Sequence, residues 1–255
     1  GKTSSANSGS FAFFNKRGLR EMIDLIVEVA TNHGGSLQLA KEFIHEFGLA
    51  GATTIKFQYQ RVKHLRKDDP QYNWQLKSQF THDAYAELRE ECEDVGLNFL
   101  LTAYHPDEVL MIRDLGCRRI KVGSGEAGEE PMAFAIRESR MHPIVSCGLV
   151  TPEKTYFGKN ATYLACVTRY PAPSGLAAAL MLTGKYDGFS DHSIGLDELR
   201  AAVVCGATTL ETHVQLPNQA REPKPFEKTI DEIRELRVFL NEDPAEKYLG
   251  RWQHA

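Results

Sequence analysis

The sequence predicts a single-domain α/β protein with the (β/α)8 (TIM) barrel fold. From Leu25 onward, eight short apolar runs alternate with amphipathic stretches. The runs show little polar alternation, as expected of parallel strands buried on both faces. The 255 residues are enough for one such barrel. A doubly wound open sheet is the alternative, but it is disfavoured because no G-x-G-x-x-G motif follows the first run.

Each predicted strand is a short run rich in apolar and β-branched residues. In chain order the strands are Leu25–Ala30, Thr54–Gln58, Asn98–Thr102, Arg119–Val122, Pro143–Cys147, Thr162–Val167, Tyr186–Ser190 and Thr209–Val214.

Apolar residues recur at helical spacing between these strands, which predicts helices that pack one face on the barrel. The predicted buried positions are Leu37, Ala40, Phe43, Ile44 and Phe47; Tyr85, Leu88 and Cys92; Val109, Ile112 and Leu115; Leu196, Leu199, Ala202 and Val203; and Ile230, Ile233, Leu236, Val238 and Leu240. Glycines at the expected helix ends support these boundaries, at Gly48, Gly96, Gly116 and Gly206.

Two connections depart from the regular pattern. The segment 59–81 is long, polar and aromatic, which predicts a loop that covers a substrate. The segment 148–161 is short and contains Pro152, so it leaves room only for a stunted fifth helix.

The first residues differ from the rest of the chain. Residues 1–21 begin with a stretch rich in Gly, Ser and Asn, and Met22 stands just before the first strand. We expect residues 1–21 to be a leader left by cloning or a disordered extension, and residues 22–255 to form the barrel.

Composition excludes several classes of protein. The net charge of −4 gives no basic footprint for nucleic acid or for an anionic membrane. No apolar run is long enough to span a bilayer or to act as a signal peptide, which predicts a cytoplasmic protein. The five cysteines are scattered and are expected to be buried, reduced thiols.

Reactive side chains gather at the carboxyl ends of the predicted strands, where barrel enzymes carry their active sites. Six of the eight ends offer a charged or imidazole group. Buried charges are costly unless they are paired or used, so these positions predict a functional site.

The residue types at these ends suggest a chemistry. Ammonium groups with short hydroxyl donors suit a ligand that carries phosphate and carboxylate, and they are Lys56, Lys121, Thr102, Ser124, Ser146 and Ser190. His192 and His213 lie on adjacent strands and can converge on a divalent metal, with Asp191 as an orienting partner. Glu28 and Glu126 are candidates for proton transfer.

Several motifs resemble those of the sialic acid synthase (NeuB) family in order and spacing. They are the segments 28–35 (EVATNHGG), 56–58 (KFQ), 121–126 (KVGSGE), 146–148 (SCG), 170–171 (YP), 189–195 (FSDHSIG) and 211–213 (ETH).

The resemblance implies a transferase that condenses phosphoenolpyruvate with an N-acylhexosamine-type aldehyde, such as N-acetylmannosamine, to give a 2-keto sugar acid and phosphate. It implies that the lysine and hydroxyl set above binds phosphoenolpyruvate and that His192 and His213 bind Mn²⁺ or Mg²⁺. Glu28 resembles the carboxylate beside the metal, and Gln58, Glu126 and Tyr170 resemble sugar contacts. Members of the family are homodimers, so a dimer is expected here.

The sequence departs from the family pattern where the sugar is recognised. The family continues into an antifreeze-like domain whose arginine reaches the partner's site, and this chain ends at Ala255 without it. Residues 217–223 lack the aspartate of a usual Gly-Pro-Asp segment, and Thr168 replaces a common asparagine. Two alternatives therefore remain: a relative that uses another aldose, with Arg169 or Arg221 binding an extra phosphate, and a non-catalytic ligand-binding barrel.

Overall fold

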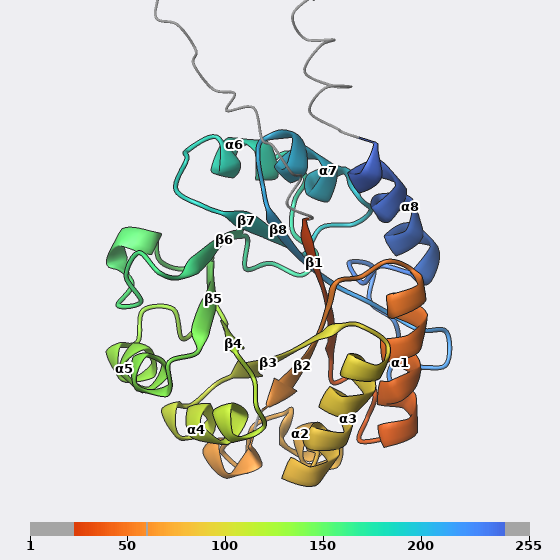
Figure 1. Cartoon of the computed structure of the whole chain (residues 1–255), viewed down its shortest axis with the longest axis vertical. Helices are drawn as coiled ribbons and strands as arrows, with labels where there is room; N and C mark the ends of the chain where they lie inside the picture. The colour runs from red at the N-terminus through yellow and green to blue at the C-terminus, as the bar shows by residue number, and fades with distance from the viewer. Residues whose placement is uncertain (1–22, 60, 243–255) are drawn as a thin grey trace, which may run out of the picture.

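The computed structural model describes residues 23–59 and 61–242, which form a closed barrel of eight parallel strands surrounded by helices (Figure 1). Each strand pairs with the next in the chain, and β8 pairs with β1 to close the ring. The predicted (β/α)8 fold is confirmed. The prediction for residues 1–21 lies outside the described residues.

All eight predicted strands are present, with their ends shifted by no more than two residues. They are β1 (Asp24–Ala30), β2 (Thr54–Tyr59), β3 (Asn98–Ala103), β4 (Arg119–Val122), β5 (His142–Cys147), β6 (Thr162–Cys166), β7 (Gly188–Asp191) and β8 (Thr209–His213).

The helices form the outer layer, and those predicted from apolar spacing are found. They are α1 (Leu37–Leu49), α2 (Tyr72–Ser78), α3 (His82–Asp94), α4 (Pro106–Asp114), α5 (Glu130–Ser139), α6 (Ala177–Met181), α7 (Asp197–Val204) and α8 (Ile230–Asn241), with the 3-10 turns η1 (Val62–His64) and η2 (Pro152–Lys154). Two details of the helix predictions are wrong. Val238 is exposed because Phe239 occupies the buried face of α8. Gly48 lies inside α1, and Gly51, with φ +100°, follows its end.

The core has two parts. Most apolar side chains lie between the barrel and the helices. Inside the barrel, a small cluster of Ile26, Leu100, Ile144 and Leu164 fills the axis. Gly188 of β7 lies against this cluster. A Cβ at this position would lie 2.8 Å from Leu164 Cδ2, which is too close for a side chain to fit. The axis is therefore packed, which leaves the strand ends as the place for a ligand.

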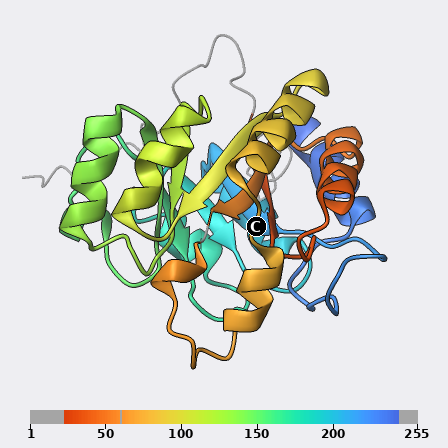
Figure 2. The same cartoon turned by 90° about the horizontal axis from the view of Figure 1, so that it is seen from below.

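The two irregular connections take different forms. After β5 the chain makes only the turn η2, so the predicted stunted fifth helix is confirmed. After β2 the chain forms η1 and α2, which project from one end of the barrel (Figure 2). Trp74 of α2 donates a hydrogen bond from Nε1 to Thr31 Oγ1 (2.9 Å), so α2 packs on the turn after β1. None of residues 61–81 lines the cavity described below, so their position does not support the predicted covering role.

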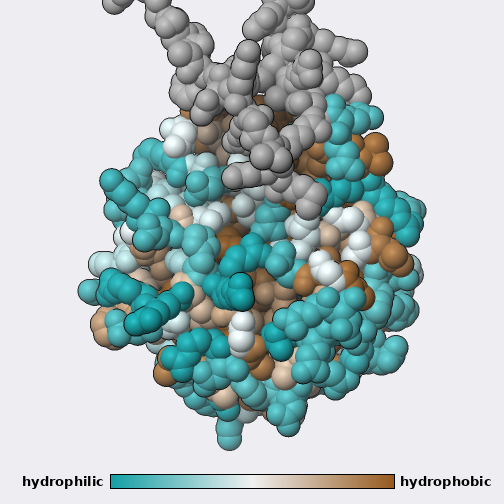
Figure 3. Space-filling model, in the orientation of Figure 1, coloured by the Kyte–Doolittle hydropathy of each residue, from teal (hydrophilic) through white to brown (hydrophobic). Residues whose placement is uncertain are grey.

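Within residues 23–59 and 61–242, no helix combines the length and the apolar character that crossing a membrane requires. On the face shown in Figure 3, hydrophobic residues form separate patches among hydrophilic ones, the usual mosaic of a protein surface. The five cysteines are unbonded thiols, and four of them are buried, as predicted.

Candidate active site

A single cavity of about 270 Å³ at the carboxyl ends of the strands is lined by every residue predicted for the site. These residues come from all eight strands or from the loops that follow them, so only the closed barrel brings them together. They are Glu28, Lys56, Gln58, Thr102, Lys121, Ser124, Glu126, Ser146, Tyr170, Ser190, His192 and His213.

Lys56 lies at the centre of a buried charge cluster. Its Nζ is 2.7 Å from Glu28 Oε2 and 3.3 Å from Glu211 Oε1. It also donates a hydrogen bond to Thr102 Oγ1 at 3.0 Å. The strand register explains why these side chains lie together, because Glu28 of β1 pairs with Lys56 of β2 on one side and with His213 of β8 on the other.

Lys121 is the second buried ammonium of the cavity. Its Nζ donates to Ser146 Oγ and to the Val122 carbonyl, both at 2.8 Å, and lies 3.9 Å from Glu211 Oε2. Burial without a close carboxylate partner lowers the pKa of Lys121. The ammonium group of Lys121 can therefore still bind an anion.

The pKa values of the two carboxylates shift in opposite directions, although the lysines lower both. Burial raises the pKa of Glu28, and Lys56 offsets this only in part. For Glu211, burial is outweighed by Lys121 and Lys56, so its pKa is lowered. For Lys56, the two carboxylates outweigh burial and raise its pKa. The cavity thus holds two carboxylates whose pKa values are shifted apart, an arrangement typical of acid–base sites.

His192 and His213 lie side by side with ring centroids 5.4 Å apart. His192 Nδ1 donates to the Val167 carbonyl at 2.9 Å, which leaves the Nε2 lone pair available. Burial lowers the pKa of His192, and that of His213 far more. Neutral imidazoles with a lone pair to offer are metal ligands, so this donor set fits a divalent ion. Tyr170 lies against His192, with ring centroids 4.0 Å apart.

The predicted sugar contacts border the same cavity. Gln58 Nε2 donates to Glu28 Oε1 at 3.1 Å, which places its amide beside the charge cluster. Burial raises the pKa of Glu126. Ser124 Oγ accepts a hydrogen bond from Gly148 N at 3.1 Å and so joins the loops after β4 and β5. The residues are placed together, and their individual roles remain predictions.

Sequence reasoning assigned no role to several residues that line the cavity, notably Glu211 and Tyr104. Glu211 carried a signal, because it lies two residues before His213 in an apolar strand and therefore shares its face. Its Oε2 is buried and forms no hydrogen bond among the described residues, so this oxygen is free to interact with a ligand. Tyr104 directly follows β3, and its place at a strand end is the only sequence feature that points to the cavity.

Two sequence-based expectations need correction. Asp191 does not orient His192: its Oδ2 lies 3.0 Å from Lys228 Nζ, and its Oδ1 accepts from Ser193 N. The Val167 carbonyl fills the orienting role instead. Arg221 is already engaged, because its guanidinium lies over Trp74 and donates to Thr31 Oγ1 at 3.2 Å.

Comparison with known proteins identifies a matching family and several relatives. The family model described as NeuB family matches residues 43–243. The chain is 24% identical over 258 residues to N,N'-diacetyllegionaminic acid synthase of Legionella pneumophila, covering 85% of this chain and 72% of the relative. It is 27% identical over 223 residues to N-acetylneuraminate-9-phosphate synthase of Homo sapiens, covering 75% of this chain and 62% of the relative.

Solved structures share the fold. A crystal structure of N-acetylneuraminic acid synthetase from Leptospira borgpetersenii superposes with a TM-score of 0.80 at 22% identity, covering 89% of this chain and 86% of that one. A truncated 3-deoxy-D-arabino-heptulosonate 7-phosphate synthase from Thermotoga maritima gives a TM-score of 0.64 at 13% identity, covering 86% and 87%. At these identities the likeness supports the barrel architecture alone.

Proposed function

The chain belongs to the NeuB family, and from this premise we propose that it condenses phosphoenolpyruvate with an N-acylhexosamine-type aldehyde to give a 2-keto sugar acid and phosphate. It is an enzyme of the transferase type. The observation that carries the proposal is the convergence of two buried lysines, four hydroxyl side chains and two neutral histidines on one cavity.

Phosphoenolpyruvate would occupy the part of the cavity around the lysines. Its phosphate and carboxylate are anions, and charge-assisted hydrogen bonds from buried ammonium groups are the strongest contacts available to them. Lys121 Nζ lies 3.9 Å from Glu211 Oε2, so this ion pair is loose and the ammonium group can turn to an entering anion. Thr102, Ser124, Ser146 and Ser190 would add short donors around the phosphate.

His192 and His213 would hold a divalent ion, Mn²⁺ or Mg²⁺, through their ring nitrogens. Such an ion, when bound, polarises a carbonyl oxygen and so makes an aldehyde carbon more electrophilic. Two observations support this role: burial lowers the pKa of His213, and the Val167 carbonyl fixes the tautomer of His192.

Glu28 would hold or move a proton at the reacting centre. Burial raises the pKa of Glu28 toward neutral pH, and a group whose pKa lies near the working pH can both donate and accept a proton efficiently. Glu211, ionised between the two lysines, would keep them charged and oriented. The two carboxylates thus have different duties because their surroundings differ.

The sugar would lie toward Gln58, Glu126 and Tyr170, which offer an amide, a carboxyl group and an aromatic ring. An N-acetylmannosamine-like aldose fits the chemistry of these groups. The relatives carry names of synthases for several different sugar acids, and this chain lacks the usual aspartate after β8.

A phosphorylated aldose is the second candidate. One relative is named a 9-phosphate synthase, and the exposed Arg169 precedes Tyr170 at the cavity. Arg169 rather than Arg221 would bind the extra phosphate, since Arg221 is held by Trp74 and Thr31. The predicted cytoplasmic location and homodimer stay predictions.

The test is an assay of phosphate release and 2-keto acid formation with phosphoenolpyruvate, Mn²⁺ and a panel of aldoses. We expect activity with N-acetylmannosamine. A preference for its 6-phosphate that is lost in Arg169→Ala, but kept in the exposed control Arg113→Ala, would favour the second candidate. No turnover across the panel, with phosphoenolpyruvate binding intact by calorimetry, would contradict both and support a binding-only barrel.

A further inference from the structure

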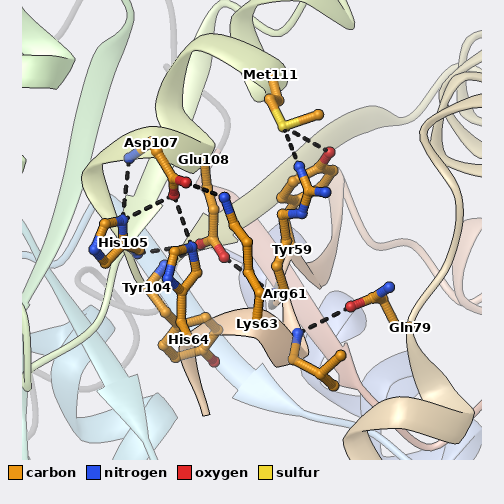
Figure 4. Close-up of polar contacts among 11 residues, drawn as sticks. Tyr59, Arg61, Lys63, His64, Gln79, Tyr104, His105, Asp107, Glu108 and Met111 are labelled. Carbon is orange, nitrogen blue, oxygen red and sulfur yellow. Dashed lines mark hydrogen bonds and ion pairs between the residues drawn. The ribbon is translucent and has the colours of Figure 1, made fainter.

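A second group of metal-ligating side chains lies outside the cavity (Figure 4). His64 of η1 and His105, the N-cap of α4, both point at Asp107 Oδ1: His64 Nε2 and His105 Nδ1 are each 2.8 Å from it. The three candidate ligand atoms lie within 4.8 Å of one another. We call these residues the His64–His105–Asp107 cluster. Among the described residues, no other group of three such side chains converges this closely.

The backbone that carries the cluster is fixed by a buried carboxylate. Glu108 accepts hydrogen bonds from Arg61 N (3.0 Å), Tyr104 N (2.8 Å) and His105 N (3.1 Å). The loop after β2 is thereby joined to the start of α4. Gln79 Oε1 also accepts from Val62 N at 2.9 Å, which anchors the same loop from the other side (Figure 4). The two histidines are therefore brought together by backbone that is already ordered.

The carboxylate of Asp107 is shared between a surface lysine and the two rings. Lys63 pairs with Oδ2, so Oδ1 remains directed at the two rings. The cluster thus offers one carboxylate oxygen and two ring nitrogens on the same side.

We propose that the His64–His105–Asp107 cluster binds a divalent transition metal such as Zn²⁺, separately from the His192–His213 pair. Two imidazoles and one carboxylate are a ligand set that zinc and its neighbours prefer, whereas Mg²⁺ and Ca²⁺ favour all-oxygen sites. The ligands are exposed, so water can complete the coordination sphere.

Binding would require a small adjustment of the rings. They are stacked, with centroids 3.9 Å apart and planes 10° from parallel, and a lone pair must point at the ion in the plane of its ring. Rotation of the two exposed side chains about χ2 would meet this need while the backbone stays in place.

The His64–His105–Asp107 cluster is linked through the chain to residues that line the cavity. His105 directly follows Tyr104, and His64 belongs to the loop that continues from Gln58; Tyr104 and Gln58 both line the cavity. A metal that joins the two loops would hold these side chains in one arrangement. This role is one of positioning at the cavity mouth.

The experiment is a Zn²⁺ titration by calorimetry of the full chain, carried out in a His192→Ala/His213→Ala background so that the other histidine pair cannot contribute. We expect one equivalent of Zn²⁺ to bind. His64→Ala and His105→Asn should each weaken it about tenfold or more, since even partners of ligands often contribute that much. Asparagine is chosen at position 105 because it keeps an N-cap acceptor for α4.

His45→Ala is the matched control, because His45 is an exposed imidazole paired with one carboxylate, Glu91, at 2.7 Å. It should leave Zn²⁺ binding unchanged. The wild-type chain provides a second readout: added Zn²⁺ should raise its Tm, and His105→Asn should reduce that rise. Equal Zn²⁺ binding with and without His64 and His105, or an equal loss in His45→Ala, would overturn the proposal. Synthase activity is not used, so the result is independent of the proposed function.

Discussion

Asp191 and Lys228 form a buried ion pair, with Oδ2 and Nζ 3.0 Å apart, that joins the end of β7 to the segment after β8. Lys228 Nζ also donates to the Ser193 carbonyl at 2.6 Å, and Lys228 N donates to the His213 carbonyl at 2.7 Å. His192 directly follows Asp191. The pair therefore holds the backbone of both predicted metal ligands.

Replacing Lys228 by methionine should destabilise the protein by about 3–5 kcal/mol, because it leaves the Asp191 carboxylate buried and unpaired. The free energy of unfolding measured in urea checks this. Lys185→Met is the control: Lys185 pairs with Glu153 at 3.0 Å on the surface and should cost less than about 1 kcal/mol. A loss in Lys228→Met no larger than in the control would contradict the structural role.

Lys121→Met should weaken phosphoenolpyruvate binding by roughly 10- to 100-fold, the effect of one hydrogen bond to a charged group. Calorimetry gives the affinity directly, and a urea melt shows whether the variant is folded. The exposed Lys154 provides the control variant Lys154→Met. Unchanged affinity in a folded Lys121→Met protein would remove this lysine from the anion site.

His192→Ala and His213→Ala should each abolish Mn²⁺ binding, because two imidazoles are the nitrogen donors of the predicted site. Electron paramagnetic resonance of free Mn²⁺ measures the bound fraction. His142→Ala, which removes an exposed imidazole hydrogen-bonded to Thr162, should bind Mn²⁺ like the wild type. Treatment with a chelator should lower synthase activity, and added Mn²⁺ should restore it. Equal affinity in the wild type and both variants would refute the metal assignment.

Acid should destabilise the protein partly through His33. Burial lowers the pKa of His33 from 6.5 to about 4, so between these values the unfolded chain binds a proton that the folded protein does not. Stability is then complete above pH 6.5 and falls as the pH drops. Between pH 7.5 and pH 5, His33 alone should contribute a loss of about 2 kcal/mol.

The measurement is urea unfolding at both pH values for wild type and His33→Gln. The variant should lose about 2 kcal/mol less on acidification, whereas the exposed control His45→Gln should behave like the wild type. Parallel losses in all three proteins would show that His33 does not take part.

The strands and their polar ends could be predicted because both depend on local sequence. A short apolar run predicts a buried strand, and the residue at its end must lie at the barrel mouth. The partner of each side chain was harder to identify. Lys228 lies beyond the last predicted strand, so nothing local connected it with Asp191. His64 and His105 stand far apart in the sequence, and only the packing of two loops around Glu108 brings them together.

The sequence also did not determine which residue of some helices is buried. Val238 and Phe239 are neighbouring apolar residues of α8, and periodicity alone did not decide which one faces the barrel. The structure buries Phe239.

The four charges formed by Lys56, Lys121, Glu28 and Glu211 sum to zero when all are ionised. Binding an anion there is therefore an exchange of partners: a phosphate must compete with Glu28 for Lys56 before it gains that contact. Such a site discriminates against weak competitors, because an anion that cannot match the displaced carboxylate gains little by entering. The same exchange would release Glu28 from its cation when substrate arrives, so the carboxylate would become a stronger base at the moment when a proton has to move.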